Sequence, residues 1–362
     1  GQAPPVREAF QYCLCLMMAE IGKMELIGTI PSDSSQLCLF ETDSHNGFLN
    51  PQLYEELRDA GIHLFNNSSI NGRDLDKNKA FELQKIIMEQ SPALIHSFLF
   101  NSDYLVWLAL YGEKHVHRAL NSMPDYQRFR VIVPRAKSLS PDAHNGIKNK
   151  PTFLSSKMND FSVALEETTV EWQDRKRIID NHLEPLISRD TTQISAVSKR
   201  GVDKWQQWSN NEVLHLPCAS IGRSDLTRID DFVENHSALR KKYGIRLDQE
   251  VYLIVSRLVP GKGLEALLHA FEYFAQNRDN VRLLIAGFGE LEDLVKEYAG
   301  RSQSISFLGR VDRQHVLELN VLANFFCLFS ESEGLPLSIQ EAMAARSCVL
   351  ASPVGGIPEL IE

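Results

Sequence analysis

The sequence has no long hydrophobic run and no excess of positive charge. Its longest apolar runs, Tyr12 to Ala19 and Tyr104 to Tyr111, fall far below the roughly 20 residues that span a bilayer. We therefore expect neither a transmembrane helix nor a signal peptide. The 362 residues carry a net charge of −9, which argues against nucleic acid as a partner held by bulk charge.

The sequence also has no Cys-x-x-Cys pair. Its six cysteines lie at 13, 15, 38, 218, 327 and 348, most of them inside apolar runs. This pattern indicates buried thiols in a reducing compartment, so we expect a cytoplasmic protein.

Short apolar runs alternate with helical patterns along the chain. The length favours two domains, and the alternation is typical of doubly wound parallel sheets. We place an N-terminal domain at 1–215 and a C-terminal domain at 216–362, and expect no regular structure from Ile221 to Asp231. Because a predicted helix at 6–20 precedes the first strand, at 24–30, and the chain stops after a Gly-Gly turn, we expect the fold to be truncated at both ends. A turn-rich connection at 31–50 and a helix at 51–61 are expected to follow that strand.

One stretch near the C-terminus, from Phe326 to Ala345, has the pattern of strand, loop and helix. It carries two carboxylates, Glu333 and Glu341, which share one helical face if the helix begins near Glu333. On their own these residues could be a helix-start acid and a surface acid. At the carboxyl edge of a parallel sheet, however, such a loop is where ligands bind.

Other loops at this edge carry further candidate ligand groups. Arg257 and Lys262 can bring two cations to a diphosphate; the alternative is that they are surface cations beside a Pro-Gly turn. Gly287 and Gly289 allow close backbone approach to a ligand, but one Gly-x-Gly is a weak signal. The turn from Gly309 to Val311 either presents backbone groups to a base or simply joins a strand to a helix.

A basic segment interrupts this acidic sequence. From Tyr126 to Lys157 there are seven Lys or Arg residues and one acid, Asp142. The segment is either a solvated loop or a surface that attracts a phosphate-bearing acceptor or an anionic membrane.

Five motifs, taken in order, resemble the GT-B retaining glycosyltransferases of family 4. They are Ser-Arg-Leu-Val-Pro-Gly-Lys-Gly (256–263), Ile-Ala-Gly-Phe-Gly-Glu (285–290), Phe-Leu-Gly-Arg-Val (307–311), Ser-Glu-Gly-Leu-Pro-Leu-Ser-Ile-Gln-Glu-Ala-Met-Ala (332–344) and Val-Gly-Gly-Ile-Pro-Glu (354–359). The resemblance implies an α/β fold with two Rossmann-like, doubly wound parallel-sheet domains facing a cleft. It also implies transfer of a hexosyl unit from a nucleotide diphosphate sugar with retention, and no metal or other cofactor.

The resemblance further assigns roles on the donor side. Arg257 and Lys262 bind the donor diphosphate, Glu333 contacts the transferred sugar and Glu341 the ribose hydroxyls. The remaining donor contacts implied are Gly287, Gly289, Arg310, Val311, Gly334, Leu335 and Pro336.

The acceptor half resembles the family less closely. His96 ends a predicted strand, where it could be either an acceptor-site residue or structural. Where many members carry a site histidine after the next strand, predicted here at Arg130 to Val133, this chain has Arg135 and Lys137. Two cations suit an anionic acceptor better than a neutral sugar.

The resemblance thus predicts a glycan or lipid-linked acceptor, phosphate-bearing if the cations bind it, and peripheral contact with the inner face of an anionic membrane if the basic segment does. Two alternatives remain open. The chain could be a GT-B nucleotide-sugar epimerase, or a non-catalytic subunit that keeps the donor pocket. One departure is local: Arg346 stands where the family usually has glycine after the helix.

Overall fold

A computed structural model of the protein describes residues 38–41, 63–66, 77–90, 94–98, 103–112, 151–157 and 183–361. The helices predicted at 6–20 and 51–61 and the strands predicted at 24–30 and 130–133 lie outside these residues. The chain divides into two compact units, with the main boundary between Leu216 and Pro217.

Unit 1 contains a four-stranded parallel sheet of order β3-β4-β5-β6 and a parallel pair, β1-β2. Its helices pack Ala80, Leu83 and Ile87 of α3 against buried residues of helix 103–112, among them Trp107. The elements are β1 (Cys38–Glu41), β2 (His63–Asn66), α3 (Lys77–Gln90), β3 (Leu94–Phe98), the helix 103–112, β4 (Thr152–Lys157), α8 (Glu184–Asp190), β5 (Gln193–Ala196), α9 (Lys199–Gln206) and β6 (Leu214–His215).

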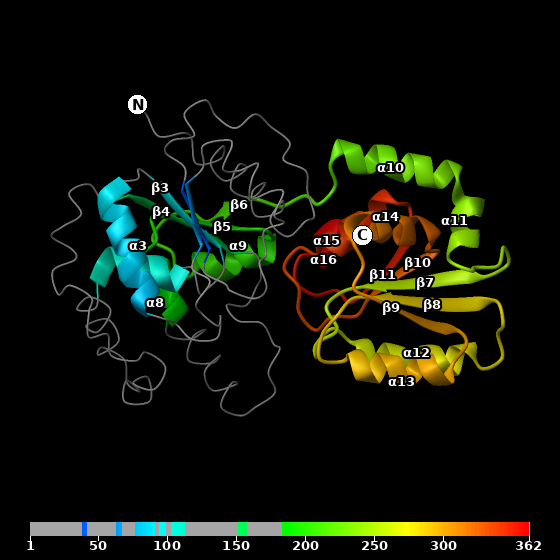
Figure 1. Cartoon of the computed structure of the whole chain (residues 1–362). Helices are drawn as coiled ribbons and strands as arrows, with labels where there is room; N and C mark the ends of the chain where they lie inside the picture. The colour runs from blue at the N-terminus through cyan, green and yellow to red at the C-terminus, as the bar shows by residue number, and fades with distance from the viewer. Residues whose placement is uncertain are drawn as a thin grey trace. The chain divides into compact units, whose positions relative to one another are not determined.

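Unit 2 contains a five-stranded parallel sheet of order β11-β10-β7-β8-β9. Figure 1 shows α12 and α13 on one face and α10, α11, α14 and α15 on the other. The elements are α10 (Arg223–Glu234), α11 (His236–Lys242), β7 (Glu250–Val255), α12 (Leu264–Ala275), β8 (Val281–Ala286), α13 (Glu292–Arg301), β9 (Ile305–Gly309), α14 (Arg313–Leu322), β10 (Phe325–Leu328), α15 (Leu337–Ala344), β11 (Cys348–Ala351) and α16 (Ile357–Leu360). The predicted α/β class with parallel sheets is confirmed.

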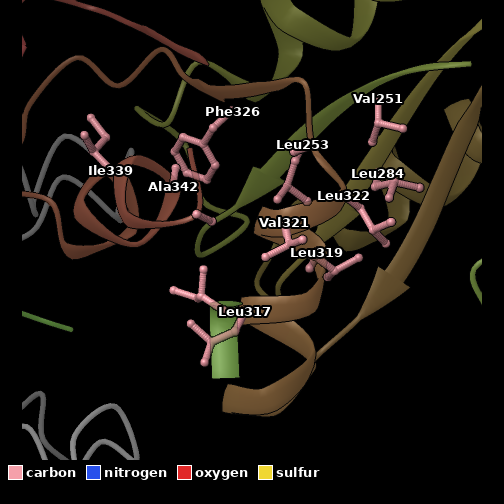
Figure 2. Close-up of a cluster of buried hydrophobic side chains, with 14 of the residues drawn as sticks. Val251, Leu253, Leu284, Leu317, Leu319, Val321, Leu322, Phe326, Ile339 and Ala342 are labelled. Carbon is pink, nitrogen blue, oxygen red and sulfur yellow. The ribbon is translucent and has the colours of Figure 1, made fainter. Parts of the chain in front are cut away.

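The strands of this sheet are apolar on both faces, because each face packs against helices. On β7, Leu253 packs into the cluster shown in Figure 2, which includes Phe326 and Ile339. The next residue, Ile254, packs into a second cluster with Leu268 of α12. Successive side chains of a strand point to opposite faces, so a continuous apolar run is what a sheet covered on both faces requires.

The strand order reverses direction beside β7. From β7 the chain adds β8 and β9 on one side, then crosses to add β10 and β11 on the other. The adjacent carboxyl ends of β7 and β10 therefore flank a topological switch point, where open α/β sheets bind ligands. The loops that leave this point are 256–263 and 329–336.

Three elements differ from the sequence expectation. Helix α10 (Arg223–Glu234) covers most of the stretch that was expected to lack regular structure and continues beyond it. Its start is stabilised by the Asp225 carboxylate, which accepts from the Gly222 amide (3.2 Å). The apolar spacing of Ile229, Phe232 and Val233 was the sequence signal for this helix. The strand β1 lies inside a segment expected to be only turns, and β4 was not expected.

Among the described residues, Arg346 is the only non-glycine with positive φ (66°). It follows α15 in the left-handed conformation that normally takes glycine. An L-residue pays roughly 1 kcal/mol there, because its Cβ crowds the backbone.

We predict that Arg346→Gly raises the free energy of unfolding by about 1 kcal/mol, measured by urea unfolding. Its guanidinium contact with Asp230 is long (3.4 Å) and exposed, so little is lost with the side chain. The matched control is Gly244 (φ 63°), where an added Cβ would meet no atom within 4 Å. Gly244→Ala should lower stability by about the same amount, and a loss of stability in Arg346→Gly would contradict the conformational argument.

Candidate donor site

The loops at the carboxyl edge of the unit 2 sheet are joined to one another by backbone hydrogen bonds. The amide of Glu331 donates to Gly261 O (2.8 Å), and that of Gly287 donates to Gly309 O (2.8 Å). The amide of Gly356 donates to Gly334 O (2.6 Å), and that of Leu258 donates to Phe288 O (2.8 Å). The predicted donor loops therefore form one connected surface.

Two glycines allow the closest of these approaches. A Cβ on Gly263 would lie 2.2 Å from Phe329 O, and one on Gly355 would lie 1.7 Å from Glu333 O. Both residues also have positive φ. No larger residue fits at either position without moving the loop that carries Glu333.

Gly287 and Gly289 also allow close contact between backbone segments, whereas the sequence predicted close approach to a ligand. A Cβ on Gly287 would meet Ser256 O at 1.9 Å, and one on Gly289 would meet Leu258 O at 2.4 Å. The close backbone approach that these glycines permit is to the 256–258 loop. Their contact with a ligand stays a prediction.

Lys262 and Glu333 face each other across the switch point. Lys262 Nζ donates to Glu333 Oε1 (2.7 Å), which also accepts from Ser330 Oγ (2.6 Å). Both charged side chains are mostly buried, at 19% and 12% exposed. Partial burial lowers the pKa of the Arg257 guanidinium, and the Glu333 carboxylate partly offsets this effect. Two cations therefore lie near the Glu333 carboxylate, and guanidinium and ammonium groups are the donors that bind phosphate anions in proteins.

Glu341 has a different environment from Glu333. Helix α15 begins at Leu337, after the N-cap Pro336, so Glu333 lies in the loop and the two glutamates do not share a helical face. The Glu341 carboxylate is 2% exposed and accepts from Arg313 Nη1. Arg313 was not among the predicted site residues. Its position at the start of the helix that follows the Gly309 turn could have marked it as a candidate.

The other predicted donor residues lie on the same edge. Gly334, Leu335 and Pro336 are buried in the loop between β10 and α15, and Pro336 has no amide to donate. Val311 is half-buried, whereas Arg310 is exposed and lies over the Phe288 ring, 4.9 Å from its centroid.

The predicted acceptor residues are only partly described. His96 lies in β3, next to Leu154 of β4 in the register, but its side chain lies outside the description. Arg135 and Lys137 also lie outside the described residues. Whether these three residues contact an acceptor stays a prediction.

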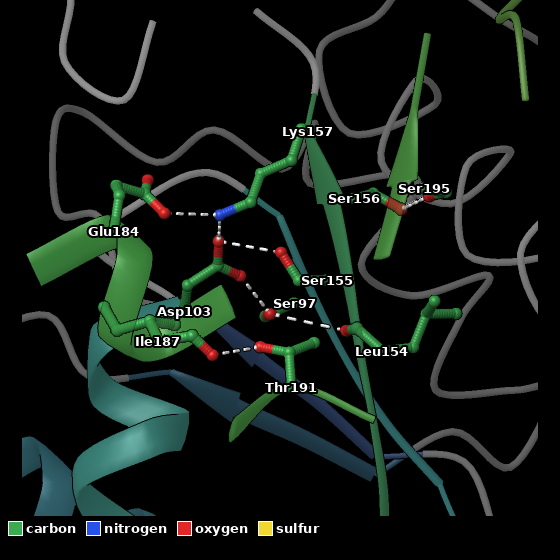
Figure 3. Close-up of polar contacts among 10 residues, drawn as sticks. All are labelled: Ser97, Asp103, Leu154, Ser155, Ser156, Lys157, Glu184, Ile187, Thr191 and Ser195. Atoms are coloured by element: carbon green, nitrogen blue, oxygen red, sulfur yellow. Dashed lines mark hydrogen bonds and ion pairs between the residues drawn. The ribbon is translucent and has the colours of Figure 1, made fainter. Parts of the chain in front are cut away.

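Unit 1 instead reveals a buried charged network that was not predicted (Figure 3). Lys157, the last residue of β4, donates to Asp103 Oδ2 (2.5 Å) and Glu184 Oε2 (2.8 Å). Ser97 and Ser155 also donate to the Asp103 carboxylate. The three charged side chains are at most 4% exposed.

The basic segment of the sequence ends at Lys157, whose charge was expected either to be solvated or to attract anions. Both interpretations are wrong for this residue. Burial lowers the pKa of Lys157, but Asp103 and Glu184 outweigh this effect and raise the pKa overall. The ammonium therefore stays charged and serves the two internal carboxylates.

We predict that Lys157→Met destabilises unit 1 by roughly 3–5 kcal/mol, because it leaves two carboxylates buried without their cation. Urea unfolding can be followed by circular dichroism, which reports on both units, and by tryptophan fluorescence, since the Trp205 ring lies 4.5 Å from Lys157 Nζ. The matched control is Lys296→Met, since Lys296 is 54% exposed in its pair with Glu292. The control should change stability by less than about 1 kcal/mol, and equal effects of the two changes would refute a special role for the network.

Among the described residues, no group of three or more His, Cys, Asp or Glu side chains could hold a metal ion, and no helix has the length and apolarity to cross a bilayer. A polar cavity lies at the amino ends of β7, β8 and β9, lined by residues that include Arg246, Arg278 and Arg282. It is at the opposite edge of the sheet from the donor loops.

The C-terminal part of the chain is similar in sequence to a known family. Residues 235–362 match the family model of glycosyl transferases group 1. This segment contains all five motifs of the donor side.

Individual proteins similar to this chain are also glycosyltransferases by name. The chain is 34% identical over 136 residues to a GDP-mannose-dependent monoacylated alpha-(1-6)-phosphatidylinositol monomannoside mannosyltransferase of Corynebacterium glutamicum, covering 35% of this chain and 36% of that protein. It is 23% identical over 268 residues to a subunit of the human phosphatidylinositol N-acetylglucosaminyltransferase, covering 71% of this chain and 52% of that protein. The chain thus spans about a third to a half of these relatives.

A solved structure extends the likeness to both units. A glycosyltransferase from Rickettsia africae matches with a TM-score of 0.58 at 16% identity, covering 95% of this chain and 77% of that chain. The fold is therefore the GT-B glycosyltransferase fold that the sequence predicted.

Proposed function

We propose that the protein is a glycosyltransferase that transfers a sugar from a nucleotide diphosphate sugar to an acceptor, with retention at the anomeric carbon and without a bound metal. The observation that carries this proposal is the meeting of Arg257, Lys262 and Glu333 at the switch point of the unit 2 sheet. The match of residues 235–362 to the group 1 family supports it.

The charges at the switch point suit departure of a diphosphate. As the bond from the sugar to the diphosphate breaks, negative charge grows on the leaving group. Arg257 and Lys262 would stabilise that charge more in the transition state than in the bound donor. Lys262 is already fixed by Glu333 before a ligand arrives, so little reorganisation is needed.

Glu333 would contact the transferred sugar. Its Oε1 accepts from both Lys262 and Ser330, and Oε2 accepts no hydrogen bond from the described residues. That second oxygen could accept a hydrogen bond from a sugar hydroxyl. The Glu333 carboxylate would thereby contact both Lys262, which binds the diphosphate, and the sugar that is transferred.

We further propose a phosphate-bearing, lipid-linked acceptor. The names of two relatives describe transfer to phosphatidylinositol or its mannoside, and the segment with Arg135 and Lys137 is rich in cations. Contact with the inner face of an anionic membrane follows if the acceptor is a lipid.

An acceptor-dependent assay tests the proposal against its two alternatives. UDP-, GDP- and ADP-sugars would be incubated with phosphatidylinositol vesicles, and nucleotide release and products followed by mass spectrometry, with and without EDTA. A transferase releases nucleotide only with acceptor, and EDTA should not change the rate. An epimerase gives free sugar or isomerised donor without acceptor, and a non-catalytic subunit binds nucleotide without turnover.

We predict that Lys262→Ala lowers kcat by about 100- to 1,000-fold, the usual effect of removing one transition-state charge contact. Donor affinity, measured by calorimetry, should fall much less, because the ground-state diphosphate keeps Arg257. Lys296→Ala is the control, since Lys296 pairs with acids on the exposed side of α13. Unchanged turnover in Lys262→Ala would remove this lysine from the mechanism.

A further inference from the structure

Arg313 joins three separate elements of unit 2. Its Nη1 donates to Glu341 Oε1 on α15, and its Nη2 donates to Asp225 Oδ2 on α10 (2.8 Å) and to Ser220 O (2.8 Å). The side chains of Arg313, Asp225 and Glu341 are 15%, 8% and 2% exposed. A buried ion network of this kind depends strongly on geometry, because each charge has lost its water.

Local structure fixes the position of Arg313. The Asp312 carboxylate caps α14 by accepting from the His315 amide (2.9 Å), so Arg313 is the first helical residue. The helix follows the Gly309 turn at the carboxyl end of β9. Arg313 therefore reaches Glu341 from the same edge that carries the donor loops.

The contact with Arg313 uses only one oxygen of Glu341. Oε2 accepts no hydrogen bond from the described residues, and it is not among their fully buried unpaired atoms. Two carboxylates face one guanidinium, so the network keeps a net negative charge. Glu341 thus has one fixed oxygen and one oxygen left to accept hydrogen bonds.

Neighbouring contacts hold the helix that carries Glu341. The Gln340 amide group donates to Cys218 O (3.1 Å) and accepts from the Ser220 amide (3.3 Å). Ser220 Oγ also donates to Leu337 O (3.2 Å). The segment 218–225 and Arg313 together restrict rotation of α15 about its axis.

We propose that Arg313 is a positioning residue, which holds Glu341 so that its Oε2 accepts a hydrogen bond from a ribose hydroxyl of the donor nucleotide. This inference rests on the proposed function, because it takes Glu341 as the ribose contact. Without Arg313 the carboxylate would lose its fixed direction and its charge partner. Recognition of ribose would then weaken more than recognition of the diphosphate.

The test compares UDP and GDP with their 2′,3′-dideoxy analogues by calorimetry. In the wild type, removing the hydroxyls should weaken binding by about 10- to 100-fold, the range for a hydrogen bond to a charged group. In Arg313→Met the affinity for the nucleotide should exceed that for its dideoxy analogue by less than about 3-fold, while the affinity for the analogue itself changes little. Arg313→Lys, which keeps the charge, should restore part of the ratio. Arg301→Met is the control, because Arg301 also contacts two carboxylates, Glu272 and Glu297, but on the exposed end of α13.

The outcomes separate the inference from the proposed function. If the wild type binds neither UDP nor GDP, the proposed function fails for these donors and the inference fails with it. If the wild type discriminates and Arg313→Met keeps the same ratio, Arg313 is only structural and the inference is overturned. Tighter nucleotide binding by Arg313→Met would also overturn it, because Arg313 would then compete with ribose.

A folding defect in Arg313→Met would not end the test. Asp225→Asn removes one charge that holds the guanidinium but keeps the side-chain size. Asp225→Asn and Arg313→Lys, as single variants, should each lower the ratio of the affinity for the nucleotide to the affinity for its dideoxy analogue by about 3- to 10-fold. Both variants retaining the full ratio would overturn the inference.

Discussion

The parallel pairing of β7 with β10 is the constraint on which the candidate donor site depends. These strands are far apart in sequence, yet Phe325 and Phe326 lie beside Tyr252 and Leu253. The pairing brings the carboxyl ends of the two strands together, and with them Lys262 and Glu333. A change of strand order would separate the cation from the carboxylate even if every side chain were kept.

Charge is organised differently in the two units. In unit 2, Lys262 and Glu333 are partly accessible, and a second cation, Arg257, lies near the same carboxylate. In unit 1, Lys157 is enclosed with two carboxylates and has a structural role. A lysine is thus left partly accessible in one sheet and neutralises internal carboxylates in the other, and burial distinguishes the two.

Much of unit 2 could be predicted from sequence, because each strand is a short apolar run that ends at a glycine or charged loop. The roles of Arg313 and Lys157 could not, since they depend on contacts between residues distant in sequence, such as Arg313 with Asp225. The helix α10 was missed because its apolar signal lies in its second half, whereas its start depends on the contact of Gly222 with Asp225. Gly287 and Gly289 permit a close approach to the neighbouring 256–258 loop, which the sequence could not distinguish from the predicted approach to a ligand.

The tight seating of Gly263 against Phe329, and of Gly355 against Glu333, has a mechanical consequence. Three chain segments that lie apart in the sequence are in backbone contact, and the amides of Glu331 and Gly356 bond each outer segment to the middle one. A shift of one segment alone would break a backbone hydrogen bond, so a ligand at this edge would meet a surface that moves as one body. Little of the free energy of ligand binding would then be lost to ordering the loops.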